Sequence, residues 1–524
     1  MFCALYKNEM IKLFRRKGTI IIICIIALLT LFVAGSSSSG GGYSLDADRY
    51  EYDSYRYENC IRAQKAGITE DDWRYDVYNN IQARGHQYQG GDYYPEDDYI
   101  RSEIGYDSSV IADQQKKDSE ALWKYIDDND SAGYFASIQK RIADNVKERR
   151  KQYNNAFENF DRKSLASAEE QVFLQIESEY EKFFSLAEGI CNFDSASIPA
   201  TYAFCKVLCS AENQLANVLY GRSGFISEKA ELDSDYYSGD KYLEYLEDFL
   251  EKVSKKSESL SIYLYSLEHG VTDTATAGYT SSGSRSALLG VFGFVFSAAA
   301  VFGVFLAGAS VSSEFSRKTV NMLVIRPVSR TKILLSKLAA CLTAVYSALI
   351  AGVFAYWLIK GIMMGFSDYL QPYLWYDGTT VKSCSFGIWF IGRCALASLG
   401  TVAYTILAFV LSAVTRSTPV STVLPMLWFA LGNVVNYIIY ALCRRAEITG
   451  IVRYLPSMYS NLWNFATEGL FASNENLDII GLLNAGFLGA DAGLDLLHGA
   501  VILPVFTIVI AVIGFVTFAK RDIK

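Results

Sequence analysis

The chain lacks the sequence patterns that most often mark an enzyme. It contains no G-x-x-x-x-G-K-[ST] segment, so it has no P-loop for binding ATP. Its three histidines are far apart and do not form a zinc-binding motif. A G-x-S-x-G nucleophile motif is also missing. We therefore expect no catalytic residue, no metal ligand and no cofactor-binding residue in this chain.

Charge is distributed unevenly along the 524 residues, which are 51% hydrophobic and carry a net charge of −8. Residues 36–284 hold 45 acidic and 26 basic side chains, a net charge of −19, whereas the remainder carries +11. The basic clusters lie beside apolar stretches and are not interleaved with aromatic residues, so we expect no nucleic-acid partner. This composition is typical of a membrane protein with one large soluble insert.

Six apolar stretches are candidates for membrane-spanning helices, because a helix needs about 20 residues to cross the hydrocarbon core. They are residues 18–34, 287–309, 333–359, 386–414, 420–443 and 499–519. The first could alternatively be a signal peptide, but the Ser/Gly-rich residues after it resemble a linker more than a cleavage site. The expected fold class is an all-α membrane protein with six transmembrane helices and a mainly helical extracytoplasmic domain between helices 1 and 2.

The segment that joins the second and third apolar stretches fixes the expected topology. It carries six basic residues and a single acidic one, Glu314. The basic residues are Arg317, Lys318, Arg326, Arg330, Lys332 and Lys337. By the positive-inside rule this loop is cytoplasmic, as are both chain termini. We expect a separate surface helix over residues 314–325, a turn at Pro327, and a helix capped by Ser329 that becomes the next span.

These features predict three parts. Residues 1–35 form the cytoplasmic N-terminus and transmembrane helix 1, residues 36–284 an extracytoplasmic helical domain, and residues 285–524 a five-helix transmembrane region with a cytoplasmic loop at 312–332. Helix-like spacing of apolar residues in the insert predicts helices within 108–160, 166–190, 198–220 and 241–267. The cysteines of the insert allow three disulfide pairings or free thiols, and the sequence does not choose (Cys60, Cys191, Cys205 and Cys209).

Three predictions concern the membrane part. Residues 360–385 are expected to form an outer loop, and residues 454–465 an aromatic segment at the membrane interface. Asn433 and Asn436 lie inside an apolar stretch, where their amides are expected to hydrogen-bond across helices.

The pattern E-x-x-x-x-T-x-x-x-L-x-x-R-P-V-S-R-x-K-I-L-L-S-K-L, from Glu314 to Leu338, resembles the first cytoplasmic loop of ABC-2-type ABC transporter permeases. The N-terminal KNEMIKLFRRKGT and the six-span arrangement are similar to that family as well, whereas the large insert is not. Lys318 stands where a glycine commonly precedes the threonine of the family pattern.

The resemblance implies a permease subunit of an ATP-binding cassette transporter in the cytoplasmic membrane, more often an exporter than an importer. ATP and Mg²⁺ would bind a separate P-loop ATPase subunit, and a second permease would complete a homodimer or heterodimer. It also implies an ATPase-coupling loop made of Glu314, Phe315, Arg317, Thr319, Leu323, Arg326, Pro327 and Arg330. The alternative is a membrane-anchored interaction protein whose outer domain binds a peptide or a cell-envelope partner without transport. Neither the substrate nor the role of the outer domain follows from the sequence.

Overall fold

A computed structural model describes residues 2–15, 43–50, 53–87, 108–218, 242–272, 284–316, 329–446, 448–463, 494 and 496–520. The chain forms two compact units. Unit 1 comprises Met1–Ser38, Thr280–Leu370 and Ser385–Lys524, and unit 2 comprises Ser39–Tyr279 and Gln371–Cys384. The large insert of the sequence is thus a unit with its own contacts.

Unit 1 consists of helices. They are α1 (Phe2–Arg15), α11 (Ser284–Ser316), α13 (Arg330–Met364), α14 (Ser367–Leu370), α15 (Phe386–Thr415), α16 (Thr418–Arg445), η7 (Thr449–Tyr454), η8 (Pro456–Tyr459) and α19 (Leu496–Lys520). Within the described ranges, five of them, α11, α13, α15, α16 and α19, are long and apolar enough to cross a membrane. The five spans expected after residue 284 are therefore confirmed, and the expected span at 18–34 lies outside the described residues.

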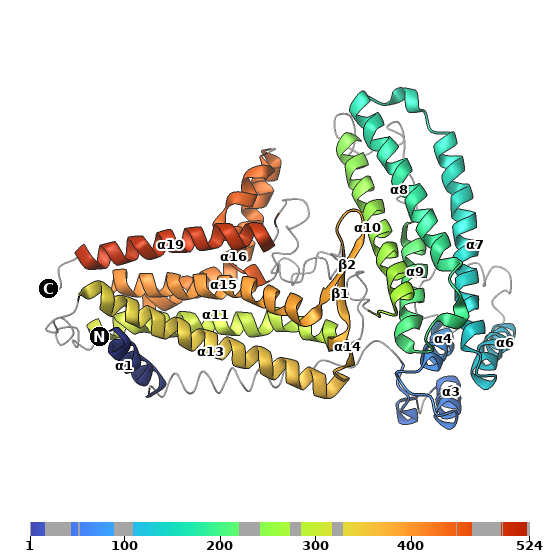
Figure 1. The fold of residues 1–524 in the computed structure, drawn as a ribbon, viewed down its shortest axis with the longest axis horizontal. Helices are drawn as coiled ribbons and strands as arrows, with labels where there is room; N and C mark the ends of the chain where they lie inside the picture. The colour runs from blue at the N-terminus through green and yellow to red at the C-terminus, as the bar shows by residue number, and fades with distance from the viewer. Residues whose placement is uncertain are drawn as a thin grey trace. The chain divides into compact units, whose positions relative to one another are not determined.

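Helices α11 and α15 form the centre of unit 1. The two pack along one another, α13 and α16 pack on α11, and α19 packs on α15 (Figure 1). In the most apolar part of α11, 61% of the residues are buried, against 17% for α19. The large exposed side chains of α16 and α19 are mostly Leu, Ile and Val, as expected for helices that face lipid.

Unit 2 is mainly helical, as predicted for the insert. Its helices are α3 (Ser54–Lys65), α4 (Trp73–Gln87), α6 (Ser108–Asp127), α7 (Ser131–Glu158), α8 (Ser167–Cys191), α9 (Tyr202–Val218) and α10 (Tyr242–His269), with short 3-10 turns η1 (Ala47–Tyr50), η2 (Arg162–Ser164) and η3 (Ser195–Ser197). Many of its aspartates begin helices: the Asp53 side chain accepts from the Arg56 N–H and that of Asp130 from the Gly133 N–H. Part of the acidic composition therefore serves helix capping.

Aromatic rings fill much of the core of unit 2. Helices α7, α8 and α10 pack together there. The ring of Tyr153 lies 4.2 Å from that of Phe157 and 4.7 Å from that of Tyr180, measured between centroids. Such tilted contacts stabilise a core beyond the area they bury. The described apolar residues whose helix-like spacing was recognised in the sequence are those that face this core.

The all-α prediction is wrong in one place, because residues 372–385 form a β-hairpin of strands β1 (Pro372–Tyr376) and β2 (Val381–Ser385). Leu374 of β1 is fully buried in a cluster with Ile262 and Val271 of unit 2. Gly378 in the turn has φ +94°, a conformation that side chains with a Cβ rarely adopt. The expected outer loop at 360–385 is thus a helix end followed by this hairpin.

The four cysteines of the insert are free thiols. Cys60 and Cys205 are fully buried, and Cys191 and Cys209 are half-buried. Burial raises the pKa of the Cys191 thiol to about 11, so it stays protonated at neutral pH. Of the alternatives left open by the sequence, this structure contains the unpaired form.

The expected interfacial position of residues 454–465 is also corrected. Tyr459 and Trp463 are almost completely buried inside unit 1, and among the described residues 454–463 Tyr454 is the aromatic residue that is largely exposed. Their rings pack on other helices: Trp463 lies 6.0 Å from the ring of Tyr404 in α15. The aromatic composition reflects helix packing here, which periodicity does not distinguish from a membrane interface.

Candidate functional site

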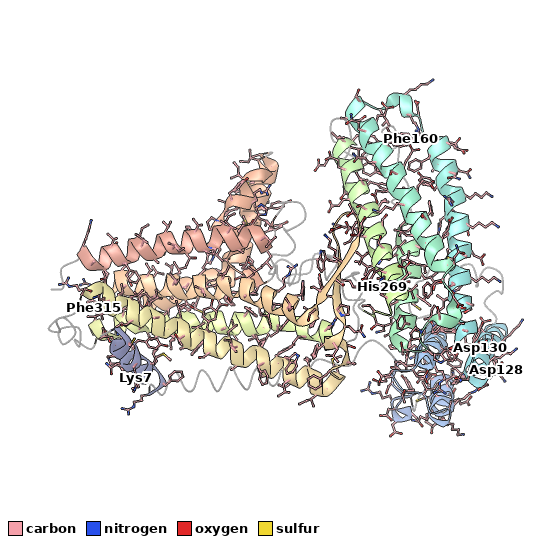
Figure 2. All side chains as sticks on the ribbon, in the orientation of Figure 1. Lys7, Asp128, Asp130, Phe160, His269 and Phe315 are labelled. Atoms are coloured by element: carbon pink, nitrogen blue, oxygen red, sulfur yellow. The ribbon has the colours of Figure 1, made fainter. Side chains whose placement is uncertain are left out.

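The predicted coupling residues lie at one end of unit 1, which we call the loop end. It is the end at which α11 stops and α13 begins, on either side of residues 317–328. Glu314 and Phe315 belong to the last turn of α11, and Arg330 is the first residue of α13. Arg317, Thr319, Leu323, Arg326 and Pro327 lie outside the described residues. Figure 2 labels Phe315 and, on α1, Lys7 at this end.

A separate surface helix does not begin at Glu314 as expected, and the remainder of that predicted helix, residues 317–325, lies outside the described residues. Helix α11 continues without a break from Ser284 to Ser316, so Glu314 and Phe315 are part of the same helix as the second span. The run of serines before Glu314 does not interrupt it, because their hydroxyls bond to the helix itself: Ser312 Oγ donates to the carbonyl of Gly308 at 2.8 Å. A displacement of Glu314 would therefore act directly on the span.

Lys337 is the centre of the loop end. Its Nζ lies 2.8 Å from Glu9 Oε2 and 2.6 Å from Glu314 Oε1. The side chain is only 4% exposed. One buried ammonium thus joins α1, α11 and α13. From the sequence, Lys337 was counted among the basic residues that orient the loop and placed near the start of the apolar stretch 333–359; its two carboxylate partners from distant segments were not predicted.

Positive and negative charges are equal in number in this cluster. Lys12 also contacts Glu9, with 2.9 Å between Nζ and Oε1, so two lysines and two glutamates share the site. Burial raises the pKa of Glu9, but the attraction of Lys337 and the hydrogen bonds from Lys337 and Lys12 outweigh it, and the pKa of Glu9 is lowered. Glu9 is therefore ionised at neutral pH. A buried pair of this kind is costly to break, because the remaining charge has no compensation.

Helix α1 docks on α13 through one of its faces. The Tyr6 hydroxyl donates to Thr343 Oγ1 at 3.0 Å, Glu9 binds Lys337, and Leu13 is buried. These three positions are spaced as expected for one face of a helix. Ile11 and Phe14 on the remaining surface are each 43% exposed. This helix was not predicted from the sequence, although the spacing of residues 6, 9 and 13 was a usable signal.

Phe315 connects the end of α11 to two other segments. Its ring lies 6.5 Å from that of Phe518 at the end of α19 in an edge-to-face contact. The guanidinium of Arg416, in the turn between α15 and α16, lies 4.6 Å from the centre of the same ring. Arg416 has φ +57° and ends α15. Phe315 therefore holds together the ends of α11 and α19 and the α15–α16 turn.

Hydroxyl groups tie α11 to α15 and α16 just before the loop end. Ser412 Oγ accepts from the backbone N–H of Ser312 at 2.9 Å. Ser421 Oγ donates to the carbonyl of Gly308 at 2.7 Å. The Ser312 and Thr418 hydroxyls bond to one another at 2.8 Å. In a membrane such bonds satisfy polar groups that have no water nearby, and they fix the register of the helices.

A second cluster of polar side chains lies among the helices of unit 1. Asn461 Oδ1 accepts from the Tyr404 hydroxyl at 2.9 Å, and Asn461 Nδ2 donates to Asn433 Oδ1 at 3.2 Å. Asn436 Nδ2 donates to the carbonyl of Ser457 at 2.8 Å. Both asparagines of α16 thus bond between elements, as predicted, but their partners lie in residues 457–461 and not in another span.

Neither the loop end nor the cluster around Asn461 resembles a catalytic centre. In the part of the chain that the structure describes, no three His, Cys, Asp or Glu side chains are placed to hold a metal ion. Ion pairs, rings and hydroxyls at the loop end and just before it join six helices, α1, α11, α13, α15, α16 and α19. The loop end can transmit force, because a force on the residues that flank 317–328 reaches α1, α11, α13 and α19 through direct contacts.

The family of the chain follows from a comparison with family models. The model described as "ABC-2 family transporter protein" matches residues 3–523. This chain belongs to the ABC-2 transporter family. No curated protein matches it, and no solved structure matches it.

The match makes the chain an ABC-2 permease, the membrane component of a transporter. Permeases of this family typically lack an ATPase domain and generally pair with an ATPase subunit. The matched residues, 3–523, include unit 2 as well as the spans. For this ABC-2 permease the loop end is the candidate site, since it holds every described residue of the predicted coupling loop.

Proposed function

We propose that this ABC-2 permease is an export subunit that receives mechanical energy from a separate ATPase docked at its loop end. One observation carries the proposal: Lys337 bridges Glu9 of α1 and Glu314 of α11, so the residues that flank 317–328 are mounted on a rigid frame. ATP and Mg²⁺ bind the partner chain. A second permease, a copy or a relative of this one, completes the translocation path.

The charge of the loop end supports a cytoplasmic position. Basic side chains from four segments lie at this end. Glu9 and Glu314 lie there as well, and both bind Lys337. The basic residues are Lys7, Lys12, Arg15, Arg330, Lys332, Arg416 and Lys520. Positive residues at the ends of spans favour the cytoplasmic side. Unit 2 is then extracytoplasmic, in keeping with its acidic composition.

In this mechanism the ATPase displaces residues 314–330, and the attached helices move with them as rigid bodies. Helix α11 carries the movement into the centre of unit 1, because Glu314 and Phe315 are in its last turn. The hydroxyl contacts of Gly308 and Ser312 pass it to α15 and α16. Interfaces of this type switch between discrete arrangements, which is what alternating access requires.

The roles within the predicted coupling loop change in one respect. The Glu314 carboxylate binds Lys337 and its side chain is 13% exposed, so we assign it to the frame and not to the docking surface. Phe315 is engaged by Phe518 and Arg416. Of the described residues, Arg330, half-buried at the start of α13, is the best placed to contact the ATPase.

The test is co-purification of the full chain with its cognate ATPase, together with stimulation of ATP hydrolysis, for Arg330→Glu. Reversing a charge at a docked contact typically costs about 2–5 kcal/mol, which weakens binding roughly 30-fold or more. Lys140→Glu, an exposed lysine of unit 2, is the matched control and should bind like the parent. If Arg330→Glu folds, binds and stimulates like the parent, Arg330 is not a docking residue. If the unaltered chain binds no ATPase, the membrane-anchored interaction protein replaces the permease.

A further inference from the structure

Residues 456–463 run through the middle of the membrane-spanning helices without being a transmembrane helix themselves. Gly400, midway along α15, touches them: a Cβ added at Gly400 would lie 3.2 Å from both the carbonyl oxygen of Ser460 and the N–H nitrogen of Leu462. Irregular backbone at membrane depth persists only where it is buried in protein or lines a cavity. Both conditions hold here.

The cavity lies beside this segment. It has a volume of about 340 Å³ and is bounded by α15, α16, η8 and α19. Its lining includes Tyr404, Trp428, Leu503 and Phe506, together with Ser457 and Ser460. Among the residues that the structure describes, no Asp, Glu, Lys, Arg or His side chain lines it. A pocket of this size and composition suits an apolar group that carries few polar atoms and no charge.

The surroundings of the cavity indicate how it is reached. Phe506 is both part of the wall and 46% exposed. Leu427 and Leu431 flank Trp428 on α16, and Val505 flanks Phe506 on α19; all three are exposed large apolar residues. Such surfaces face hydrocarbon in a membrane protein. The cavity therefore opens toward the lipid side of these two helices.

One polar atom in the wall is incompletely satisfied inside the protein. Ser460 is 8% exposed, and its hydroxyl lies close to the Tyr404 hydroxyl but makes no well-formed hydrogen bond in the part of the chain that the structure describes. Leaving a buried hydroxyl incompletely satisfied has a free-energy cost. An uncharged hydroxyl, amide or ester of a bound molecule would remove that cost. The wall thus offers a mainly apolar slot with a hydrogen-bonding position at Ser460.

We propose that this cavity binds one hydrocarbon chain of an uncharged amphiphile that enters from the bilayer and places a neutral polar group at Ser460. The proposal goes beyond the docking of an ATPase and does not depend on it. Binding at α15, α16 and α19 is measured without the partner subunit, so failure of either proposal leaves the other standing.

The experiment uses the full chain in phosphatidylcholine nanodiscs with a monoacylglycerol whose acyl chain carries a diazirine. After illumination, labelled peptides are located by mass spectrometry. We expect adducts concentrated on Tyr404, Trp428 and Phe506. Ala403→Phe fills the cavity and should lower the yield there about tenfold, whereas Ile438→Phe, on the exposed face of α16 outside the cavity, should not change it. A lysophosphatidic acid with the same chain should label weakly, because no cationic side chain lines the cavity.

Ser460→Ala tests the polar position without adding bulk. It should lower labelling by the monoacylglycerol about fivefold, the effect of losing roughly 1 kcal/mol of hydrogen bonding, while a diazirine alkane labels as before. Adducts spread evenly over the exposed faces of α16 and α19, with no effect of Ala403→Phe, would mean that lipid only surrounds the helices and would overturn the proposal. Cross-links through Trp428→Cys to a second copy of the chain, with no lipid adduct, would assign the cavity to a permease interface instead.

Discussion

The ammonium of Lys337 and the carboxylate of Glu314 form a buried ion pair at 2.6 Å although 23 residues separate them in the chain. The pair closes the segment that connects α11 to α13 into a loop with fixed ends. Glu9, 328 residues from Lys337, completes the bridge and brings α1 into it. Because the lysine is almost fully buried, its replacement has consequences that can be calculated.

Lys337→Met should destabilise unit 1 by about 3–5 kcal/mol, the usual cost of leaving buried charges without their partner. Two carboxylates, Glu9 and Glu314, would remain beside an apolar side chain. Thermal unfolding of the purified chain in nanodiscs measures the change. Lys332→Met, an exposed lysine in the same helix, is the control and should shift stability little.

The interpretation of that result is checked by removing the stranded charges. The triple variant Lys337→Met, Glu9→Gln and Glu314→Gln should recover most of the lost stability, because replacing a whole buried ion cluster is often neutral. If the coupling frame depends on the bridge, ATPase stimulation stays low in the triple variant even though it folds. Equal stability of Lys337→Met and the parent would contradict the buried bridge.

A close approach of helices at Gly308 gives a second test. A Cβ added there would lie 2.7 Å from Thr422 Cγ2 and 3.0 Å from the carbonyl oxygen of Ser421, so α16 must move away from α11. Gly308→Ala should destabilise unit 1 by about 1–3 kcal/mol, as overpacking does. Gly293→Ala lies in the same helix with nothing within 4 Å and should be neutral or slightly stabilising. Similar effects of the two substitutions would argue against the tie between α11 and α16.

Topology is testable with a native residue. Cys3 is exposed on α1 at the loop end. If that end is cytoplasmic, a membrane-impermeant maleimide should label Cys3 only after the membrane is opened, whereas Lys140→Cys in unit 2 should be labelled in intact cells. Labelling of Cys3 in intact cells would reverse the proposed orientation. Cys3→Ser identifies the signal that belongs to Cys3.

The spans were predictable because the bilayer imposes a length and an apolar composition that a single sequence displays. The start of α13 at Arg330 followed from Pro327, although the Ser329 side chain makes no capping hydrogen bond. Helices α6 to α10 of unit 2 followed from apolar spacing, which reports which side chains face the interior, whereas α3 and α4 did not, because the sequence before residue 108 shows little periodicity. Each of these predictions depends on residues that lie within about ten positions of one another in the sequence.

Contacts between residues far apart in the chain could not be predicted from such local patterns. The sequence shows Lys337 as one of the basic residues near the start of an apolar stretch, and nothing in it indicates that Glu9 and Glu314 lie beside this lysine. Residues 372–385 were read as a loop, yet their Asp377-Gly378 turn between aromatic and β-branched residues was a hairpin signal. Trp463 and Tyr459 are buried by helices that the sequence does not place next to them. The coupling role of residues 317–328 stays a prediction.

The last prediction concerns a buried carboxylate in unit 2. Asp76 on α4 is nearly inaccessible, and its Oδ2 accepts from the Tyr134 hydroxyl at 2.8 Å and from Asn80 Nδ2 at 3.3 Å. Burial raises the pKa of Asp76, and hydrogen bonds from Tyr134 and Cys209 only partly offset this. The nearest basic residue of α7, Arg141, is bound to Glu212 at 2.8 Å.

The sign of the pH effect follows from the direction of that shift. Between the ordinary carboxyl pKa, about 4, and the raised pKa of folded Asp76, the folded chain binds more protons than the unfolded chain. The free energy of unfolding therefore falls as pH rises through this window, and the loss is complete above the pKa of folded Asp76. Asp76→Asn removes the titration while keeping an oxygen that accepts from Tyr134.

Asp76→Asn should therefore stabilise unit 2 at pH 8 and have progressively less effect as the pH is lowered toward 4. Hydrogen–deuterium exchange of α4 and α7 in the full chain measures it: the protection of the variant relative to the parent should rise with pH, by about tenfold for each unit of pKa shift. Asp144→Asn, an exposed aspartate of α7, should show no such trend. A ratio of protection that stays constant across pH would mean that folded Asp76 titrates like an exposed carboxylate, and the burial of this side chain would then have no energetic consequence for unit 2.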